Sequence, residues 1–325
     1  MSTGRHVLVT GGAGFIGSHL VDRLLDDEGT RVTVLDKLTY AGSLANLEAH
    51  DGDERLTFVR GDVTDPGIVA SLVAVADRAI HAAAETHVDR SITGPQEFLQ
   101  TNVIGTQVML EACRETGTPM LMVSTDEVYG AGDPGGGSFS EDDALRPRSP
   151  YAASKAGADL LCRAYHVTYG ASVTVVRGTN AYGPRQHPEK AIPTYALAAL
   201  DGRPLPVYGD GTNLREWLHV SDWVAGCFAV LDAGEAGVVY NIGAGTELEN
   251  LELARRVCEL AEVPASLVTF VEDRPGHDFR YGIRSDRLEG LGWKPSVAFD
   301  DGLRETVEWY RGHRDWVATM LAPVS

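Results

Sequence analysis

The chain has 325 residues, of which 43% are hydrophobic and 23% charged, so the composition excludes a disordered or fibrous protein and provides for a sizeable core. The formal net charge of −18 would repel a phosphate backbone, so we expect no nucleic-acid partner. No apolar run approaches the roughly 18 residues of a membrane span, and the N-terminus leaves no room for a signal peptide, which together favour a cytoplasmic protein without membrane contact.

Short β-branched runs alternate with longer amphipathic segments through the first 180 residues. The runs cover residues 7–10, 32–36, 57–60, 79–83, 120–124 and 173–177. Nearly continuous apolar strands separated by helices indicate parallel pairing with both faces of the sheet covered. The sequence therefore predicts an α/β fold whose first domain, residues 1–180, is a Rossmann-like, doubly wound parallel sheet.

After residue 180 the pattern changes to short helices mixed with irregular segments rich in glycine and proline. A helix from about Asp300 places Leu303, Val307 and Tyr310 on one face, so it should pack as a cap. No linker or internal repeat separates the two parts. We expect residues 181–325 to form a smaller α/β lobe packed tightly on the first, with a cleft at the carboxyl ends of the strands.

A glycine-rich loop follows the first predicted strand. The segment Gly11-Gly12-Ala13-Gly14-Phe15-Ile16-Gly17 has the spacing GxxGxxG and precedes a helical pattern over 19–25. Glycines let the backbone approach a pyrophosphate, and a helix N-terminus offers it free N–H groups and a partial positive charge. The loop therefore predicts a dinucleotide site on Gly11, Gly14, Phe15, Ile16 and Gly17.

The second predicted strand ends on Asp36, nineteen residues after Gly17, where a carboxylate can accept hydrogen bonds from the ribose hydroxyls. Because it would repel a 2′-phosphate, we expect NAD rather than NADP. Lys37 leaves an opening for NADP, although a solvated lysine is the commoner explanation. Asp62 is placed to meet the adenine amino group, and its alternative role is to cap the next helix.

Four potentially reactive side chains follow the fifth apolar run, two at the end of the strand and two on the next predicted helix. Asp126 and Glu127 directly follow the fifth run, and Tyr151 and Lys155 stand four apart on one face of a predicted helix. A neighbouring ammonium and a nicotinamide cation would favour the Tyr151 phenolate. Adjacent carboxylates in a water-poor cleft push one pKa upward, which gives the pair separate acid and base roles. The alternative is two solvated acids in a loop.

The cysteines and histidines do not indicate a metal centre. The cysteines are scattered without CxxC spacing, and the ten histidines include no HExxH pair. We therefore expect neither metal nor disulfides, and reduced core cysteines at Cys113, Cys162, Cys227 and Cys258.

The loop and the Tyr151–Lys155 pair together resemble the extended short-chain dehydrogenase/reductase superfamily. The triplet Thr125-Asp126-Glu127 more closely resembles the dTDP-glucose 4,6-dehydratases of that superfamily. Further segments resemble the same family in the same order along nearly the whole chain, namely 38–42, 83–91, 149–155, 188–190, 208–211 and 274–278.

The resemblance implies a lyase that dehydrates dTDP-glucose with tightly held NAD, for deoxysugar synthesis. In the family's reaction, Tyr151 takes the proton of the sugar 4-hydroxyl as hydride passes from C4 to NAD, and Thr125 hydrogen-bonds the same oxygen. Glu127 then removes the C5 proton while Asp126, held protonated, donates to the departing 6-hydroxyl. Hydride then returns to C6 and a proton returns to C5, which gives dTDP-4-keto-6-deoxyglucose with no net oxidation.

The resemblance also implies the remaining contacts. Beyond the glycine loop and Asp36, the cofactor contacts are Lys37, Thr39, Asp62, Val63, Ala83, Tyr151 and Lys155. The cationic contacts for the diphosphate are Lys190, Arg215 and Arg274. The polar substrate contacts are His87, Ser124, Asn180, Glu189, Asn250 and His277. For Arg215, a surface ion pair with Glu216 is the alternative. Helices near 96–115 and 151–169 resemble the pair that forms a dimer interface in relatives, so a homodimer is expected.

The chain departs from the usual family pattern at a few positions. Gly178 stands where the family usually has Cys, Ala181 replaces Asn, Ser43 replaces Asn, and Trp223 replaces His. The choice between thymidine and uridine diphosphate stays open.

Two other functions also stay open. Another nucleotide-sugar dehydratase or a 4-epimerase of the superfamily would share the loop, Tyr151 and Lys155, but the Asp126–Glu127 pair disfavours an epimerase. A non-catalytic dinucleotide sensor is disfavoured because all four reactive residues are present.

Overall fold

The computed structural model describes residues 5–133, 135–273 and 278–322. At its centre lies a seven-stranded parallel sheet in the order β10-β6-β5-β4-β1-β2-β3. The strands are β1 (Arg5–Thr10), β2 (Thr30–Asp36), β3 (Leu56–Arg60), β4 (Arg78–His81), β5 (Met120–Thr125), β6 (Val173–Gly178) and β10 (Val239–Ile242). The predicted doubly wound, Rossmann-like fold is confirmed. The strand order reverses between β1 and β4, and ligands bind at such switch points.

Alternate residues of the central strands pack on opposite faces of this sheet. On β1, Val7 and Val9 join the core beneath α1 (Phe15–Leu25) and α8 (Val220–Ala233). Leu8 points the other way, into the core shared with α2 (Pro66–Val73), α5 (Thr106–Thr116) and α6 (Pro150–Tyr169). Burial on both faces is why these strands are almost continuously apolar.

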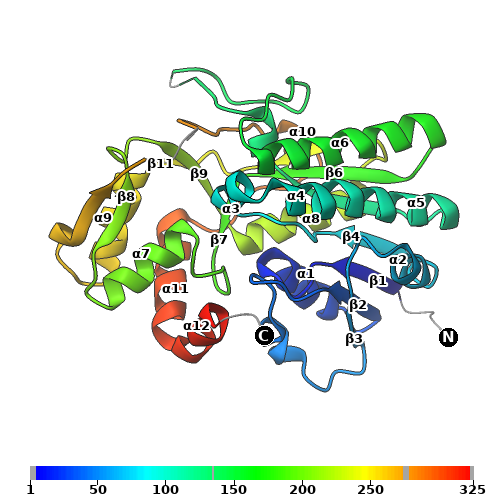
Figure 1. Cartoon of the computed structure of the whole chain (residues 1–325), viewed down its shortest axis with the longest axis horizontal. Helices are drawn as coiled ribbons and strands as arrows, with labels where there is room; N and C mark the ends of the chain where they lie inside the picture. The colour runs from blue at the N-terminus through cyan, green and yellow to red at the C-terminus, as the bar shows by residue number, and fades with distance from the viewer. Residues whose placement is uncertain (1–4, 134, 274–277, 323–325) are drawn as a thin grey trace.

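A second lobe lies beside the sheet (Figure 1). Its helices are α7 (Ala191–Leu200), α9 (Asn250–Leu260), α11 (Phe299–Gly312) and α12 (Arg314–Leu321). Its small sheets are β11-β9-β7 and β12-β8, built from β7 (Asn180–Tyr182), β8 (Leu205–Tyr208), β9 (Leu214–His219), β11 (Glu247–Glu249) and β12 (Val268–Val271). The predicted helical face of Leu303, Val307 and Tyr310 is confirmed, since all three are fully buried in this lobe's core.

The two lobes are interleaved in sequence. Strand β10 pairs with β6 at the edge of the central sheet, and α8 and α10 (Asp286–Gly290) contact it, although all three follow residue 180. Pairing with β10 covers the backbone groups that β6 would otherwise expose. The expected boundary at residue 180 therefore does not divide the structure into two continuous segments.

The remaining elements are short. They are α3 (Val88–Thr93), α4 (Pro95–Phe98), a π-helix (Leu99–Gly105), and the 3-10 helices η1 (Leu44–Asn46), η2 (Glu48–His50), η4 (Asp126–Tyr129) and η5 (Ala265–Leu267). The helix expected near 96–115 is thus divided into α4, the π-helix and α5. All four cysteines are buried free thiols. No helix within the described ranges is long and apolar enough to cross a membrane.

Candidate active site

One cleft runs along the carboxyl ends of the parallel strands. Its walls come from the loops after β1 to β6, from the start of α6 and from the second lobe. Most residues predicted from the sequence line it: Gly11, Gly14, Phe15, Ile16, Gly17, Asp36, Lys37, Thr39, Val63, Ala83, Ser124, Thr125, Asp126, Glu127, Tyr151, Lys155, Asn180 and Lys190. The fold therefore collects these residues from eight separate parts of the chain at the switch point of the sheet.

The glycine loop is shaped as a cradle that larger residues would fill. A Cβ on Gly17 would lie 2.0 Å from the Gly11 carbonyl oxygen, and one on Gly11, whose φ is +70°, would lie 2.6 Å from the Ala83 nitrogen. Helix α1 begins directly after Gly14 with no side-chain cap, and Phe15, Ile16 and Gly17 of its first turn line the cleft. This arrangement fits the pyrophosphate of a dinucleotide.

Lys37 is held by its neighbours. Its Nζ donates to Thr101 Oγ1 at 3.1 Å and lies 3.5 Å from Asp62 and 3.6 Å from Glu85. Lys37 is therefore not simply solvated, because its side chain is 33% exposed but also pairs with these carboxylates. Two carboxylates already balance its charge, which leaves it a poor partner for a 2′-phosphate and favours NAD.

Asp36 and Asp62 both bind backbone N–H groups. Asp36 lines the cleft and accepts from Ala13 N at 3.1 Å and Leu38 N at 2.8 Å. Asp62 accepts from Thr64 N at 2.9 Å, next to the cleft lining rather than in it. The alternative role of Asp62 as a helix cap is wrong, because Asp65 caps α2 through Gly67 N and Ile68 N.

The acidic pair sits where β5 turns into η4. Thr125 caps η4: its Oγ1 accepts from Glu127 N at 3.3 Å and donates to Asp126 Oδ1 at 3.2 Å. Burial raises the pKa of Asp126 to about 8, and the neighbouring Glu127 carboxylate adds to the shift. Asp126 is therefore protonated at neutral pH, as expected for an acid.

Tyr151 and Lys155 lie in the first turns of α6, which Ser149 caps through Ala152 N. Burial raises the pKa of Tyr151, and Glu127 raises it further, while Lys155 Nζ donates to the Val123 carbonyl at 2.8 Å. The effect of a nicotinamide cation on the Tyr151 phenolate stays a prediction. Burial lowers the pKa of Lys155 to about 8.

Two predicted substrate residues lie together just outside the lining. His87 caps α3, and its Nε2 is 3.6 Å from Glu189 Oε2, which also meets Arg90 at 3.3 Å. Lys190 follows Glu189 in the chain and lines the cleft, where its Nζ donates to Thr86 O at 3.3 Å. Ser124 lines the cleft with a buried Oγ that has no hydrogen-bond partner in the described ranges.

Arg215 is buried in the second lobe and does not line the cleft. Its guanidinium donates to the carbonyls of Leu214 and Asp278 and lies 4.5 Å above the Tyr281 ring. The Glu216 carboxylate accepts instead from the backbone of Gly245 and Ile283, because successive strand residues point to opposite faces. The surface ion pair between Arg215 and Glu216 is therefore wrong.

Three further substrate residues lie away from the lining or outside the described ranges. Asn250 begins α9 as a buried residue away from the cleft lining. Arg274 and His277 lie outside the described residues.

Two departures from the family pattern fit each other. Trp223 lines the cleft, is buried, and donates from Nε1 to Thr179 O at 3.3 Å. A Cβ on Gly178 would lie 2.2 Å from that indole nitrogen, so the tryptophan requires glycine there. Ala181 also lines the cleft, whereas Ser43 caps η1.

Sequence reasoning missed several lining residues, of which Glu85, Thr179 and His187 are the most polar. Burial raises the pKa of Glu85, and its backbone N donates to Asn102 Oδ1 at 2.9 Å. Glu85 lies in the segment 83–91, whose resemblance could have marked it.

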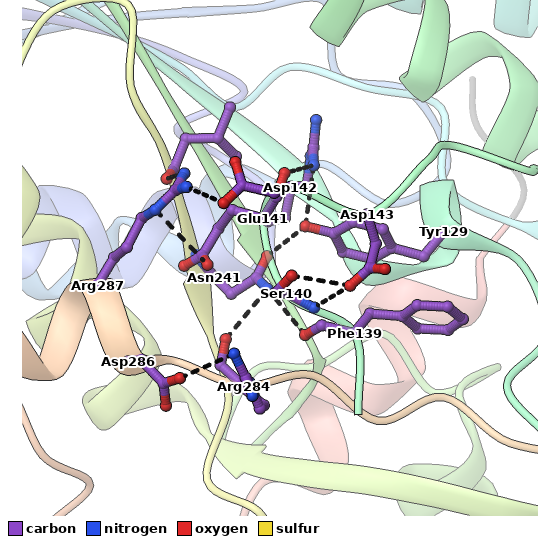
Figure 2. Close-up of polar contacts among 12 residues, drawn as sticks. Tyr129, Phe139, Ser140, Glu141, Asp142, Asp143, Asn241, Arg284, Asp286 and Arg287 are labelled. Carbon is purple, nitrogen blue, oxygen red and sulfur yellow. Dashed lines mark hydrogen bonds and ion pairs between the residues drawn. The ribbon is translucent and has the colours of Figure 1, made fainter. Parts of the chain in front are cut away.

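A polar network connects η4 to strands β6 and β10 (Figure 2). Tyr129 Oη donates to Asn241 Oδ1 at 2.7 Å and accepts from Arg177 at 2.9 Å, while its ring stacks on Phe139 at 5.3 Å. Asn241 N donates to Glu141 at 3.0 Å, which ties the 139–143 segment to β10. The turn that carries Asp126 and Glu127 is thus anchored to the central sheet.

No cluster of three or more potential metal-ligating side chains occurs among the residues for which the structure gives positions.

Comparison with known proteins reveals close relatives. The family model described as GDP-mannose 4,6 dehydratase matches residues 8–306. The dTDP-glucose 4,6-dehydratase of an Actinoplanes species is 52% identical over 95% of this chain and 99% of its own length. The dTDP-glucose 4,6-dehydratase of Streptomyces venezuelae, solved with NAD and dTDP bound, has a TM-score of 0.94 and 50% identity over 97% of this chain and 99% of that one. The UDP-glucose 4-epimerase of Thermus thermophilus, solved with NAD, has a TM-score of 0.87 and 33% identity over 95% of this chain and 99% of that one.

Proposed function

The chain belongs to the dTDP-glucose 4,6-dehydratase family, and we propose that it is a hydro-lyase that converts dTDP-glucose to dTDP-4-keto-6-deoxyglucose, a step in deoxysugar synthesis. One observation carries the proposal. The cleft holds a buried Asp126, whose pKa is raised by burial, beside Glu127, and Tyr151 of α6 also lines it. The fold alone does not decide, because a 4-epimerase shares it. The carboxyl pair decides, since elimination of water needs an acid and a base besides the redox tyrosine.

NAD is the cofactor. The loop of Gly11 to Gly17 would hold its pyrophosphate, and Asp36 would accept from its adenosine ribose. Its chemistry is reversible hydride transfer, which oxidises the sugar before water leaves and reduces it afterwards. Because the same cofactor serves both steps, it stays bound through each turnover.

Tyr151 and Thr125 act at the sugar 4-oxygen in this proposal. Tyr151 accepts the 4-hydroxyl proton, and the Thr125 hydroxyl, fixed by its contacts to Asp126 and Glu127 N, hydrogen-bonds the same oxygen. Lys155 directs its ammonium to the Val123 carbonyl and to the cofactor side of the cleft. The 4-ketone that results acidifies the neighbouring C5 proton.

Asp126 and Glu127 then divide the elimination between them. Glu127 removes the C5 proton as general base, and Asp126 donates its proton to the departing 6-hydroxyl. Burial is the main cause of the raised pKa of Asp126, so the enclosed cleft itself keeps the acid loaded at neutral pH.

The two lobes divide the binding in the same proposal. The sheet lobe holds NAD and the catalytic residues, and the second lobe receives the nucleotide. Arg215 supports this assignment, because it donates to the carbonyl of Asp278, and the expected contacts Arg274 and His277 precede Asp278 in the sequence. His87, Glu189 and Lys190 would contact the sugar or diphosphate from the junction of the lobes.

Incubation of the purified chain with dTDP-glucose tests the function. We expect a 4-keto sugar, detected by its absorbance in alkali, with no NAD added beyond what the protein carries. UDP-glucose is the matched substrate that differs in the base and the ribose. Turnover of UDP-glucose alone, or epimerisation at C4 without loss of water, would overturn the proposal.

We also propose that the chain forms a homodimer through α6 and the neighbouring π-helix. Leu160 and Val167 are 56% and 73% exposed and lie seven residues apart on α6, hence on one face. Leu99 and Ile104 of the π-helix are also exposed, at 52% and 44%. Such a cluster of apolar side chains is typical of an interface. Light scattering should give a dimer for the parent chain and a monomer for Val167→Glu.

A cytoplasmic location completes the proposal. The buried free thiols support it, because they suit a reducing compartment. Cell fractionation should recover the protein with cytoplasmic markers.

A further inference from the structure

A single buried residue, Asn46, connects three distant parts of the chain, two through its side chain and one through its backbone carbonyl. Its Nδ2 donates to the Ala13 carbonyl at 2.8 Å, and its Oδ1 accepts from Trp316 Nε1 at 2.9 Å. Its backbone carbonyl accepts from Arg185 Nη1 at 2.8 Å. Asn46 is 1% exposed, and its two side-chain hydrogen bonds are buried, while the bond from Arg185 is partly buried. Such buried polar groups are costly to leave unpaired.

The first connection fixes the glycine loop. Ala13 lies between Gly11 and Gly14, and its carbonyl accepts from both Asn46 Nδ2 and Ser43 N, the latter at 3.0 Å. Its N–H donates to Asp36 at 3.1 Å. Both polar backbone groups of Ala13 are therefore paired within the protein, which leaves the N–H groups at the start of α1, where no side chain caps the helix, for the cofactor.

The second connection reaches the part of the second lobe that lines the cleft. Arg185 directs its guanidinium away from the cleft to Asn46, and also pairs with Asp22 of α1. The residues that follow it, Gln186 and His187, line the cleft.

His19 of α1 reinforces this connection. Burial and the Arg185 guanidinium lower the pKa of His19 to about 4, so its ring is neutral. Nδ1 then accepts from Arg185 at 3.0 Å while Nε2 donates to Pro184 O at 2.9 Å. Helix α1, which begins at the glycine loop, and the segment that carries Gln186 and His187 are thus joined through partly buried hydrogen bonds.

The third connection reaches α12 near the C-terminus. Trp316 is buried at 9% exposure, and its ring packs edge-on against Trp309 of α11 at 4.8 Å. Figure 1 shows α11 and α12 together at the lower edge of the second lobe, on the side nearer the N-terminal part of the chain. The indole N–H is thereby held rigidly in place for Asn46.

We infer that Asn46 is a positioning residue that keeps the glycine loop closed on the cofactor and couples this loop to the second lobe. Neither Asn46 nor Trp316 lines the cleft, so they act through Ala13 and Arg185 rather than on the reacting atoms. The inference rests on the proposed use of NAD. Its consequence is that the release of NAD is slow, and slower still when the nucleotide site is filled.

Two substitutions test the bond from Asn46 to Ala13 and the bond from Trp316 to Asn46 separately. Asn46→Asp retains an acceptor for Trp316 but places an oxygen against the Ala13 carbonyl. Trp316→Phe keeps the aromatic packing and removes the indole donor. Trp293→Phe is the matched control, because Trp293 is similarly buried and its indole donates to Asp222 O at 3.1 Å, away from Asn46.

The measurement is the rate at which pre-bound labelled NAD leaves in an excess of unlabelled NAD, with and without dTDP, alongside Tm. Loss of one neutral hydrogen bond predicts release roughly fivefold faster for Trp316→Phe. Asn46→Asp should release NAD about tenfold faster or more, because repulsion adds to the loss. dTDP should slow release in the parent and in Trp293→Phe, and should slow it less in Asn46→Asp.

The outcomes distinguish the inference from the proposed function. If the parent chain holds no NAD, the proposed function fails and the inference fails with it. If NAD binds but both test variants release it at the parent rate, the role of Asn46 is overturned alone. Equal acceleration in Trp293→Phe would also overturn it, since the cause would then be general loss of stability. If Asn46→Asp does not fold, Trp316→Phe decides.

Discussion

Two buried aspartates on adjoining elements of the sheet lobe have opposite surroundings. Asp159 of α6 accepts from Arg177 Nε of β6 at 2.6 Å, and Arg177 continues to Tyr129 in the network behind η4. Asp126, at the end of β5, is equally buried but forms no ion pair with any described cation and adjoins Glu127. Both aspartates are thus buried, but Asp159 lies beside a cation and Asp126 lies beside a second carboxylate.

The difference separates a structural carboxylate from a reactive one. A cation beside a buried carboxylate favours its charged form, whereas a second carboxylate favours the protonated form. Asp159 therefore anchors α6 to β6, and Asp126 keeps a proton that it can donate. The same contrast applies to Glu141, which is bound to backbone in the supporting network, and Glu127, which lines the cleft.

Glu127→Gln should have the largest effect on turnover. The variant keeps the shape of the side chain but cannot remove the C5 proton, so the formation of 4-keto-6-deoxy product should fall by roughly 10²- to 10⁴-fold. Binding of dTDP-glucose and NAD should persist, which isothermal titration and the bound NAD content would measure.

Glu141→Gln is the matched control for this prediction. Glu141 accepts from Asn241 N in the network of Figure 2 and does not line the cleft. Its variant should lose stability and keep turnover per folded molecule. Normal turnover in Glu127→Gln, or an equal loss in Glu141→Gln, would contradict the division between the two regions.

Asp159→Asn should have the largest effect on stability. Removal of one partner from a buried ion pair leaves the Arg177 charge uncompensated, which costs about 3–5 kcal/mol. Urea unfolding would measure this loss, and the folded fraction should still turn over dTDP-glucose. Loss of turnover at unchanged stability would place Asp159 with the reactive group instead.

Asp126→Asn should change how stability depends on pH. Burial and Glu127 raise the pKa of Asp126 from 3.8 to about 8, so between these values the folded chain holds a proton that the unfolded chain releases. The free energy of unfolding of the parent therefore falls as pH rises through this range, by on the order of 1 kcal/mol per pH unit for this group. The variant lacks the titration, so its stability relative to the parent should increase from pH 5 to pH 8.

Urea unfolding of both chains at pH 5, 6, 7 and 8 would measure this increase. A constant difference between the two chains across the series would mean that Asp126 is already ionised in the folded state. Asp126 would then resemble Asp159 rather than contrast with it.

The sequence alone predicts much of the fold and of the cleft. The apolar runs place six of the seven central strands to within three residues at either end, because burial on both faces leaves a continuous pattern in each strand. Strand β10 is not predicted, because Asn241 interrupts the apolar pattern of its four residues, Val-Tyr-Asn-Ile. Asn241 is buried and bonds to Tyr129. Nothing local in the sequence connects residues 129 and 241.

The same limit applies within the site. The glycine loop and the pairs Asp126–Glu127 and Tyr151–Lys155 are local patterns, and the structure brings them into one cleft. Lys37 was expected to be solvated because its partners, Asp62, Glu85 and Thr101, come from three other segments. Likewise, Gly178 and Trp223 looked like independent departures until their contact showed that one makes room for the other.

Arg284→Ala should have the smallest effect on the free energy of unfolding, because it removes an exposed ion pair rather than a buried one. Arg284 Nη2 meets Asp286 at 3.1 Å at the edge of the network in Figure 2, with side chains 57% and 65% exposed. Water already solvates both charges, so the loss should be about 0–1 kcal/mol and should shrink further in high salt. The Arg284 backbone N–H would still donate to Phe139 O at 2.8 Å, which leaves the 139–143 segment in place. The same urea titration measures this loss. A loss as large as that of Asp159→Asn would mean that ion pairing alone, without burial, determines how much a carboxylate in this lobe contributes to the free energy of unfolding.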